Sequence, residues 1–391
     1  MLENKKLNPK FWTRRSFLAT IPLLFTNCSS TSNAKEKASF QHPAHNIKKE
    51  TMRIRGINYD TGTEYVKGDN TRLIWNQTDI KRDMKVIKNE LFCNSVNLYG
   101  SSIDRLIETA NIALGAGLSV SIQARLIDGN KKQMLDYLKL TAIESEKLKS
   151  KGDVILNTGC ELTLFTSGFL PGKTFLDRMQ NLIWSWPALA IFYSSWIDHL
   201  TEMSDVSRSF FSGPITYSAG VWEDVDWNKF DYIGVNLYRD RDNEFSYVSD
   251  LKNLQSIGKP VIITEFGCCT FEGAERLGGG GWLVVDHSKI PPEIKEGYKR
   301  NEKVQAEHLA ELLDLYYKEN IHGCFIFDFL ESGNVYNPEN PKFDLDMASY
   351  GIVKALPPSS KDRLHWEKKL AFQTVAERYQ SFSLGSLHPK S

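Results

Sequence analysis

The chain has 391 residues, of which 41% are hydrophobic and 25% charged, and its 48 basic side chains balance 48 acidic ones. This is the composition of a globular protein, with enough residues for one large domain or two medium ones. The balanced charge gives no general case for a nucleic-acid partner. After the N-terminus, no apolar run approaches the ~20 residues of a membrane span.

The first 28 residues have the features of an export signal. Basic residues precede the stretch "TRRSFLA" (13–19), an apolar segment follows as far as Phe25, and a polar region begins at Thr26. The pair Arg14-Arg15 resembles a twin-arginine signal, and Cys28 resembles a lipoprotein acylation site. A plain cleaved signal and an uncleaved anchor are the alternatives. We expect an exported protein, periplasmic or on the outer cell surface, joined to the membrane only through Cys28, with residues 29–50 as a flexible tether.

Eight short apolar segments have the length and composition of buried strands. They cover residues 52–60, 94–100, 118–126, 153–161, 213–219, 230–238, 258–267 and 322–329. Between most of them the sequence is helix-like, and we expect helices at 79–91, 102–117, 137–148, 188–203, 301–318 and 363–379. Such alternation predicts parallel strands joined by crossover helices. Eight units favour the α/β class and one (β/α)8 TIM-barrel domain over 51–391 with long βα loops. An open doubly wound sheet is the alternative.

The cysteines and histidines do not indicate a metal site or a disulfide framework. The six cysteines, at 28, 93, 160, 268, 269 and 324, include no CxxC pair. The eight histidines are scattered and show no HExxH or similar ligand spacing. We therefore expect neither a metal ion nor a cofactor.

Two of the predicted strands end on glutamates. Glu161 ends "DVILNTGCE" (153–161), and Glu265 follows the apolar run in "VIITEFG" (261–267). In a (β/α)8 barrel the reactive groups lie at the carboxyl ends of the strands, and these are strands four and seven by our count. A structural ion pair of Glu265 with Arg55 or Arg125 is the alternative to a catalytic role.

Polar and aromatic side chains at the other strand ends converge on the same rim. A rim of hydrogen-bonding groups and aromatic platforms suits a sugar, and cleavage of a glycosidic bond usually needs two flanking carboxyl groups. The residues that we expect to bind substrate are Tyr59, Asn97, Arg125, Trp222, Asn236, Tyr238 and Phe327.

These features resemble the clan A glycoside hydrolases. The glutamates ending strands four and seven, "TEFG" (264–267), "GVNLY" (234–238) and the tail "SYGIVK…HWEKKLAF" are similar to that clan. More closely, "RIRGINYDTG", "GCELTLFTSGFLPG", "TEFGCCTFEGA" and "DLDMASYGIVK" resemble a bacterial family often labelled abortive infection protein, over roughly residues 52–380.

The clan resemblance implies a role for each matching residue. Glu161 would be the general acid/base and Glu265 the nucleophile, with Tyr238 donating a hydrogen bond that keeps Glu265 ionised. Two positions depart from the clan pattern: Cys160 replaces the Asn that contacts the sugar 2-hydroxyl, and Phe327 or Phe329 replaces the strand-eight Trp.

The sequence thus predicts an exported glycoside hydrolase or transglycosidase acting on a carbohydrate substrate, with retention as the expected stereochemistry. The alternative is a lipoprotein barrel that binds a glycan or a protein without turnover, linked to phage defence only through the family label. Sugar, linkage and oligomeric state do not follow from the sequence.

Overall fold

A computed structural model gives the structure of residues 52–182, 186–357 and 363–385, with only the backbone of 186–193. The expected export signal, its acylation site Cys28 and the tether lie outside the described residues. Within the described part, no helix is both long and apolar enough to cross a membrane.

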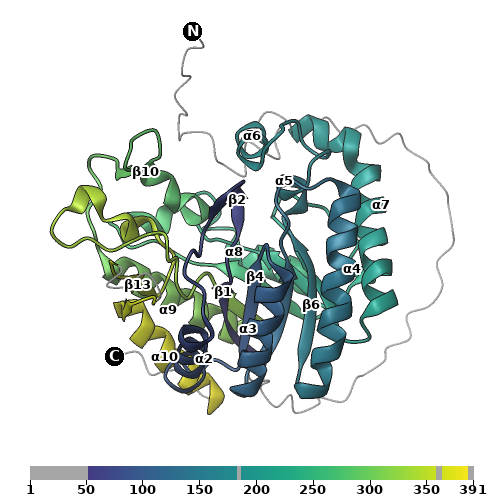
Figure 1. The fold of residues 1–391 in the computed structure, drawn as a ribbon, viewed down its shortest axis with the longest axis horizontal. Helices are drawn as coiled ribbons and strands as arrows, with labels where there is room; N and C mark the ends of the chain where they lie inside the picture. Colours follow the sequence, from purple (N-terminus) through teal and green to yellow (C-terminus); the bar gives the residue numbers. More distant parts are fainter. Residues whose placement is uncertain (1–51, 183–185, 358–362, 386–391) are drawn as a thin grey trace, which may run out of the picture.

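Eight parallel strands form the centre of the molecule (Figure 1). They are β1 (Ile54–Asp60), β4 (Ser95–Gly100), β5 (Ser119–Ala124), β6 (Val154–Cys160), β7 (Ile215–Ser218), β8 (Ile233–Asn236), β9 (Val261–Phe266) and β12 (Gly323–Ile326). Their hydrogen-bonded order is β7-β6-β5-β4-β1-β12-β9-β8. Ala219, next after β7, pairs in parallel with Val235 of β8 and brings the two edges together. The predicted (β/α)8 barrel is confirmed, and the open sheet is wrong.

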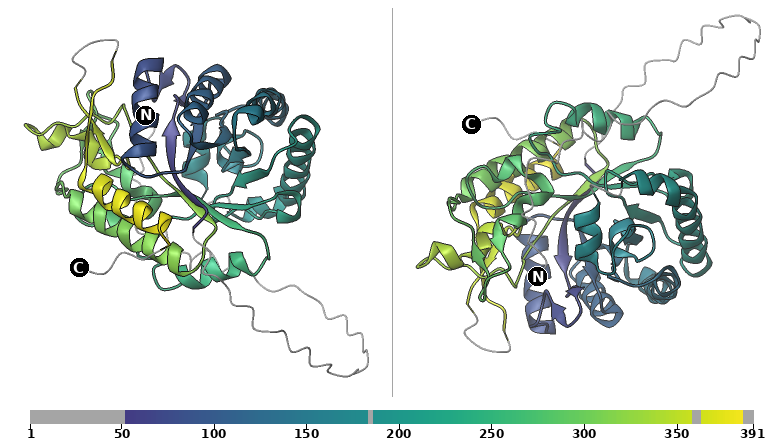
Figure 2. Two further views of the ribbon diagram at one scale, coloured as in Figure 1. Left: turned by 90° about the horizontal axis from the view of Figure 1, so that it is seen from below. Right: turned by 90° about the horizontal axis from the view of Figure 1, so that it is seen from above.

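Helices surround these strands (Figure 2). They are α2 (Gln77–Asn89), α3 (Ile103–Gly115), α4 (Lys131–Leu148), α5 (Leu162–Phe165), α6 (Phe175–Asn181), α7 (Trp186–Phe210), α8 (Tyr247–Gln255), α9 (Glu302–Lys318) and α10 (Leu370–Ser383). The last helix starts later than the predicted 363, because Trp366–Lys368 (β14) pairs with Val353–Ala355 (β13) as a hairpin. Helix α10 then packs beside α9, with the Tyr317 and Phe382 rings stacked at 4.5 Å.

Alternation along the strands separates two apolar regions. On β1, Ile57 and Tyr59 lie in the large core between the strands and the helices. Ile54 instead packs with Ile262 and Phe325 inside the barrel. There, a Cβ added to Gly56 would lie 2.3 Å from the Phe325 ring, so only glycine fits. The barrel interior is therefore a filled core and not a pore.

The loops that follow the strands gather at one end of the barrel. The hairpin of β2 (Glu64–Val66) and β3 (Asp69–Asn70) follows β1, and α5 and α6 follow β6. Figure 1 shows these elements together at the top of the view. This end carries the carboxyl termini of the strands, where active groups are expected in this fold.

Candidate active site

The two predicted carboxylates lie at this end of the barrel, joined by a short series of contacts. Glu161 follows the last residue of β6, and Glu265 lies near the end of β9. Asn236 Nδ2 lies 3.0 Å from Glu161 Oε1 and 3.3 Å from Cys160 Sγ. That sulfur lies 3.6 Å from Glu265 Oε1. The fold therefore brings together two acids that are more than a hundred residues apart in the chain.

The backbone of Glu161 has an uncommon conformation. Its φ of 41° and ψ of 45° are left-handed, and it is the residue from which α5 starts. A non-glycine residue rarely adopts these angles, which cost on the order of 1–3 kcal/mol. The pairing of β6 with β7 also shifts register between Asn157 and Cys160. The strand thus ends in an irregular turn at the position of a candidate catalytic group, where such features are common.

The surroundings of Glu161 favour its neutral form. Burial, followed by the negative charge of Glu265, raises the pKa of Glu161 to about 8. The hydrogen bond from Asn236 opposes this shift, since it favours the charged carboxylate. Glu161 is therefore largely protonated at neutral pH, as a general acid must be.

Glu265 has a cationic partner. Arg125 Nη2 lies 2.7 Å from Glu265 Oε1, and the two side chains are only 2% and 9% exposed. Arg125 also donates to the Tyr65 hydroxyl at 2.8 Å and to the Gln123 amide oxygen. Its guanidinium lies 4.2 Å from the centre of the Tyr99 ring. An ion pair of Glu265 with Arg125 was one of the two structural alternatives raised by the sequence, and the structure contains it.

Asn236 holds Glu161 and is itself held. Its Nδ2 donates to Glu161, and its Oδ1 accepts from Thr264 Oγ1 at 2.8 Å. The side chain is buried. The sequence predicts a substrate-binding role for Asn236, and in the structure its contacts hold it against Glu161.

Two further predicted residues, Trp222 and Phe327, are half-buried. The Trp222 indole donates to Thr163 Oγ1 at 3.0 Å, beside α5. Phe327 stacks on Tyr99 at 5.8 Å, whereas Phe329 is buried against Tyr59. Of the two candidate replacements for the clan tryptophan, Phe327 is therefore the one near the site.

Tyr238 lies close to Glu265 but without the expected hydrogen bond. Its pKa is raised, first by burial and then by the charge of Glu265. Its ring packs edge-on against Tyr350 at 5.7 Å. Among the described contacts, none joins the Tyr238 hydroxyl to Glu265, and Arg125 occupies that position as donor.

Two predicted substrate-binding residues point elsewhere. The Tyr59 hydroxyl donates to Asp83 Oδ2 at 2.7 Å, outside the barrel, because odd-numbered positions of β1 face the helices. Asn97 is fully buried and donates to Asn58 Oδ1 at 2.6 Å within the barrel. Both residues serve the packed interior, so these two predictions are wrong.

Sequence reasoning missed Glu223, which organises the turn after Glu161. Its carboxylate accepts from Thr163 N, Thr163 Oγ1, Tyr217 Oη and Gly220 N at 2.7–3.0 Å. The Tyr217 hydroxyl in turn accepts from Leu162 N at 2.8 Å. Burial raises the pKa of Glu223. It follows a short strand in a loop, and no local pattern distinguishes it from a solvated glutamate.

Cys160 is not a nucleophile in this setting. Burial raises the pKa of its thiol well above the ordinary value, so little thiolate is present at neutral pH. Across the described ranges, no group of three or more His, Cys, Asp or Glu side chains is placed to hold a metal ion.

No family model matches the chain, so the resemblance to the family labelled abortive infection protein is unsupported. No curated protein matches it either. Several solved structures do match this chain. A GH113 β-1,4-mannanase aligns with a TM-score of 0.55 and 15% identity over 84% of this chain and 99% of its own. The GH113 β-mannanase from Alicyclobacillus acidocaldarius aligns with a TM-score of 0.51 and 15% identity, over 84% of this chain and 97% of its own. A GH2 β-galacturonidase from Eisenbergiella tayi aligns with a TM-score of 0.51 and 16% identity, over 87% of this chain and 52% of its own. At these identities the similarity establishes the barrel fold.

Proposed function

We propose that the protein is a glycoside hydrolase that uses Glu161 and Glu265 as its two catalytic carboxyl groups. The observation that carries the proposal is the contrast in their surroundings. Burial and the charge of Glu265 raise the pKa of Glu161 to about 8, whereas Glu265 pairs with the Arg125 guanidinium at 2.7 Å. Neighbouring carboxyl groups in contrasting electrostatic environments are the arrangement expected of an acid and a nucleophile.

In the proposed reaction, a Glu265 oxygen attacks the anomeric carbon while the glycosidic C–O bond breaks. Glu161 gives its proton to the departing oxygen, which leaves as an alcohol, and an ester joins the sugar to Glu265. The Glu161 carboxylate then takes a proton from water as the water oxygen attacks the same carbon and releases Glu265. Two inversions give net retention, the outcome expected for carboxyl groups ~5–5.5 Å apart.

The decisive experiment is a screen of glycans and aryl glycosides with the 391-residue protein and its Glu265→Gln variant. β-1,4-Mannans and β-galacturonides come first, because structures with this barrel include enzymes named for them. We expect turnover that falls by at least about a thousandfold in Glu265→Gln. Glu307→Gln, an exposed change on α9, is the control. Equal activity in Glu265→Gln would refute the proposal.

Retention has its own test. NMR of the first-formed product reports its anomeric configuration before mutarotation. A 2-fluoro glycoside should leave a covalent adduct that mass spectrometry of peptides locates at Glu265. Product of inverted configuration with no adduct would leave a hydrolase but reject the nucleophilic role of Glu265.

The second candidate is a barrel that binds glycan without turnover. The Arg125–Glu265 ion pair favours it, because the pair also satisfies Glu265 as a structural residue. A binding protein should show no turnover of any glycan, and its Glu265→Gln variant should keep the parent Kd for a glycan that binds. Turnover that disappears in this variant rejects the alternative.

We also propose export through the N-terminal segment, with acylation at Cys28, on the sequence pattern described above. Changing Arg14-Arg15 to Lys-Lys should leave precursor in the cytoplasm, whereas continued export would indicate the general secretory route. Fatty-acid labelling should disappear in Cys28→Ala. Labelling that persists would reject the lipid anchor.

A further inference from the structure

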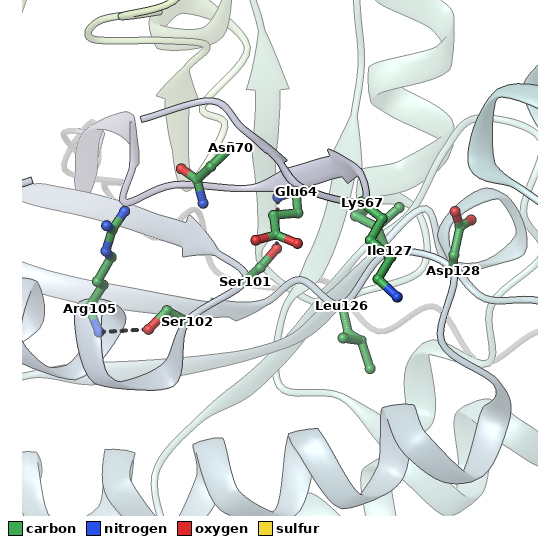
Figure 3. A pocket seen from close by; sticks show the side chains of 9 residues that line it. All are labelled: Glu64, Lys67, Asn70, Ser101, Ser102, Arg105, Leu126, Ile127 and Asp128. Carbon is green, nitrogen blue, oxygen red and sulfur yellow. Dashed lines mark hydrogen bonds between the residues drawn. The ribbon is translucent and has the colours of Figure 1, made fainter. Parts of the chain in front are cut away.

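A cavity lies at the carboxyl end of the barrel, on the arc formed by the loops that follow β1, β4 and β5. Its volume is about 500 Å³, within the range of small-molecule sites. The β2–β3 hairpin and the loops after β4 and β5 form its walls (Figure 3). The lining residues are Glu64, Lys67, Asn70, Ser101, Ser102, Arg105, Leu126, Ile127 and Asp128.

This cavity, which we call the hairpin pocket, adjoins the catalytic groups through two residues. Tyr65 lies in the hairpin between Glu64 and Lys67, and its hydroxyl accepts from Arg125, the partner of Glu265. Arg125 directly precedes Leu126, which lines the pocket. The hairpin is fastened to the end of β4 by the 3.0 Å bond from Glu64 N to Ser101 Oγ. Tyr65 and Arg125 therefore link the pocket to Glu265 through direct contacts.

The chemistry of the pocket suits an uncharged polyhydroxyl ligand. Two cationic side chains, Lys67 and Arg105, and two anionic ones, Glu64 and Asp128, line the pocket, and Asp128 also pairs with Arg178 outside the lining. The lining therefore carries both signs of charge. Leu126 and Ile127 add an apolar surface that fits the C–H face of a sugar ring. Among the described contacts, the Glu64 and Lys67 side chains have no hydrogen bond or ion pair, so their polar atoms remain available.

We infer that the hairpin pocket binds a second sugar unit of the substrate, which is then a neutral oligosaccharide or polysaccharide and not a simple monosaccharide glycoside. This inference rests on the proposed function for its link to turnover, but binding tests it separately. One sugar unit would lie at the carboxylates, and a neighbouring unit would lie between the hairpin and the β4 and β5 loops.

The test compares ligand lengths in a double variant, Glu64→Ala with Lys67→Ala. Both side chains are exposed, so the fold should persist. The matched control is Lys303→Ala with Glu307→Ala, an exposed Lys–Glu pair on α9. The probes are β-1,4-linked manno-, gluco- and xylohexaose and the 4-nitrophenyl β-glycosides of the same monosaccharides. Calorimetry on the full chain carrying Glu265→Gln measures binding without turnover.

We expect the pocket variant to weaken the best-binding hexaose by five- to tenfold, as the loss of one or two hydrogen bonds would. The kcat/KM of the pocket variant on that hexaose should fall by the same factor as its affinity. Its rate on the 4-nitrophenyl monosaccharide glycosides should stay within twofold of the parent rate. Equal loss on both probes, no loss on the hexaose, or no hexaose binding at all would overturn the inference. If the pocket variant weakens hexaose binding but no substrate is turned over, the proposed function is rejected and the inference about the pocket stands. If aryl glycosides are turned over but the length of the oligosaccharide makes no difference, the inference about the pocket is rejected and the proposed function stands.

Discussion

Glu161 and Glu265 are the same residue type at equivalent ends of two barrel strands, yet their surroundings differ throughout. Glu265 lies within β9, whose pairing with β8 also shifts register at this point, and meets a guanidinium at 2.7 Å. Glu161 follows a register shift, has a left-handed backbone and accepts a hydrogen bond from the amide of Asn236. The comparison teaches that supporting residues, and not the acids themselves, create the different environments on which the proposed roles of proton donor and nucleophile depend.

The two supporting arrangements have different origins. Arg125, the residue after β5, reaches Glu265 together with Tyr65 of the hairpin and Gln123 of β5. Asn236 and Glu223 support Glu161 from β8 and from the loop after β7. Because the two sets share no member, each can be removed by itself, and this allows the comparison to be tested.

The largest effect should come from the acid and should depend on the leaving group. Glu161→Gln removes the proton donor, a role worth about 10²- to 10⁴-fold in rate. A sugar leaving group needs that proton, whereas a 2,4-dinitrophenolate leaves without it. The variant should therefore lose hydrolysis of oligosaccharides and retain the release of dinitrophenol. Glu265→Gln should fail on both substrates, and an equal loss on both for Glu161→Gln would contradict its role as the acid.

Arg125→Met should give the next effect, and it should appear in stability as well as rate. It leaves a buried carboxylate without its cation, a change that costs about 3–5 kcal/mol of unfolding free energy. Denaturant titration measures this cost, and we expect kcat to fall about a hundredfold. Arg208→Met is the control, because its pair with Asp231 is 40% and 42% exposed and should contribute less than about 1 kcal/mol. An equal loss of unfolding free energy in the two variants would show that the Arg125–Glu265 pair stabilises the protein no more than an exposed pair does.

The pH dependence should distinguish the two supports of Glu161. Because Glu161 must be protonated and its pKa is about 8, activity should fall as the pH rises through about 8. Asn236→Ala removes a donor to the charged form, so the basic limb should move upward. Glu223→Gln removes a negative charge that raises the same pKa, so the limb should move downward.

Purely structural roles for these two residues predict a different result. Both variants would then lose stability and leave the position of the basic limb unchanged. Shifts in opposite directions, measured on kcat/KM in protein that remains folded by circular dichroism, are the outcome that supports two separate influences on Glu161.

The smallest effect should belong to Tyr238→Phe. The ring contact with Tyr350 is retained, and Arg125 already donates to Glu265. We expect the rate of the Tyr238→Phe variant to stay within about threefold of the parent rate and its stability to be unchanged. Active-site hydrogen bonds can tighten once substrate binds. A loss of ten- to a hundredfold would therefore indicate that the contact expected from the sequence forms during turnover.

The sequence alone determined the barrel and the positions of its two acids. β-Branched runs, helical periodicity and strict alternation along the chain are local signals, and they predicted eight strands and most of the helices. Glu161 and Glu265 could be selected because a strand that ends on a carboxylate at the reactive end of this fold is itself a local pattern.

The direction and the partners of side chains were decided by tertiary structure. Tyr59 and Asn97 are polar residues near strand ends, like Arg125, but Tyr59 faces the helices and Asn97 lies deep in the barrel. Arg125, Asn236 and Glu223 come to the acids from three other parts of the chain, and the pKa of Glu161 depends on burial that only the assembled loops create. Local sequence encodes which residues form a strand, whereas the charge state of a group depends on distances between segments that meet only when the barrel closes.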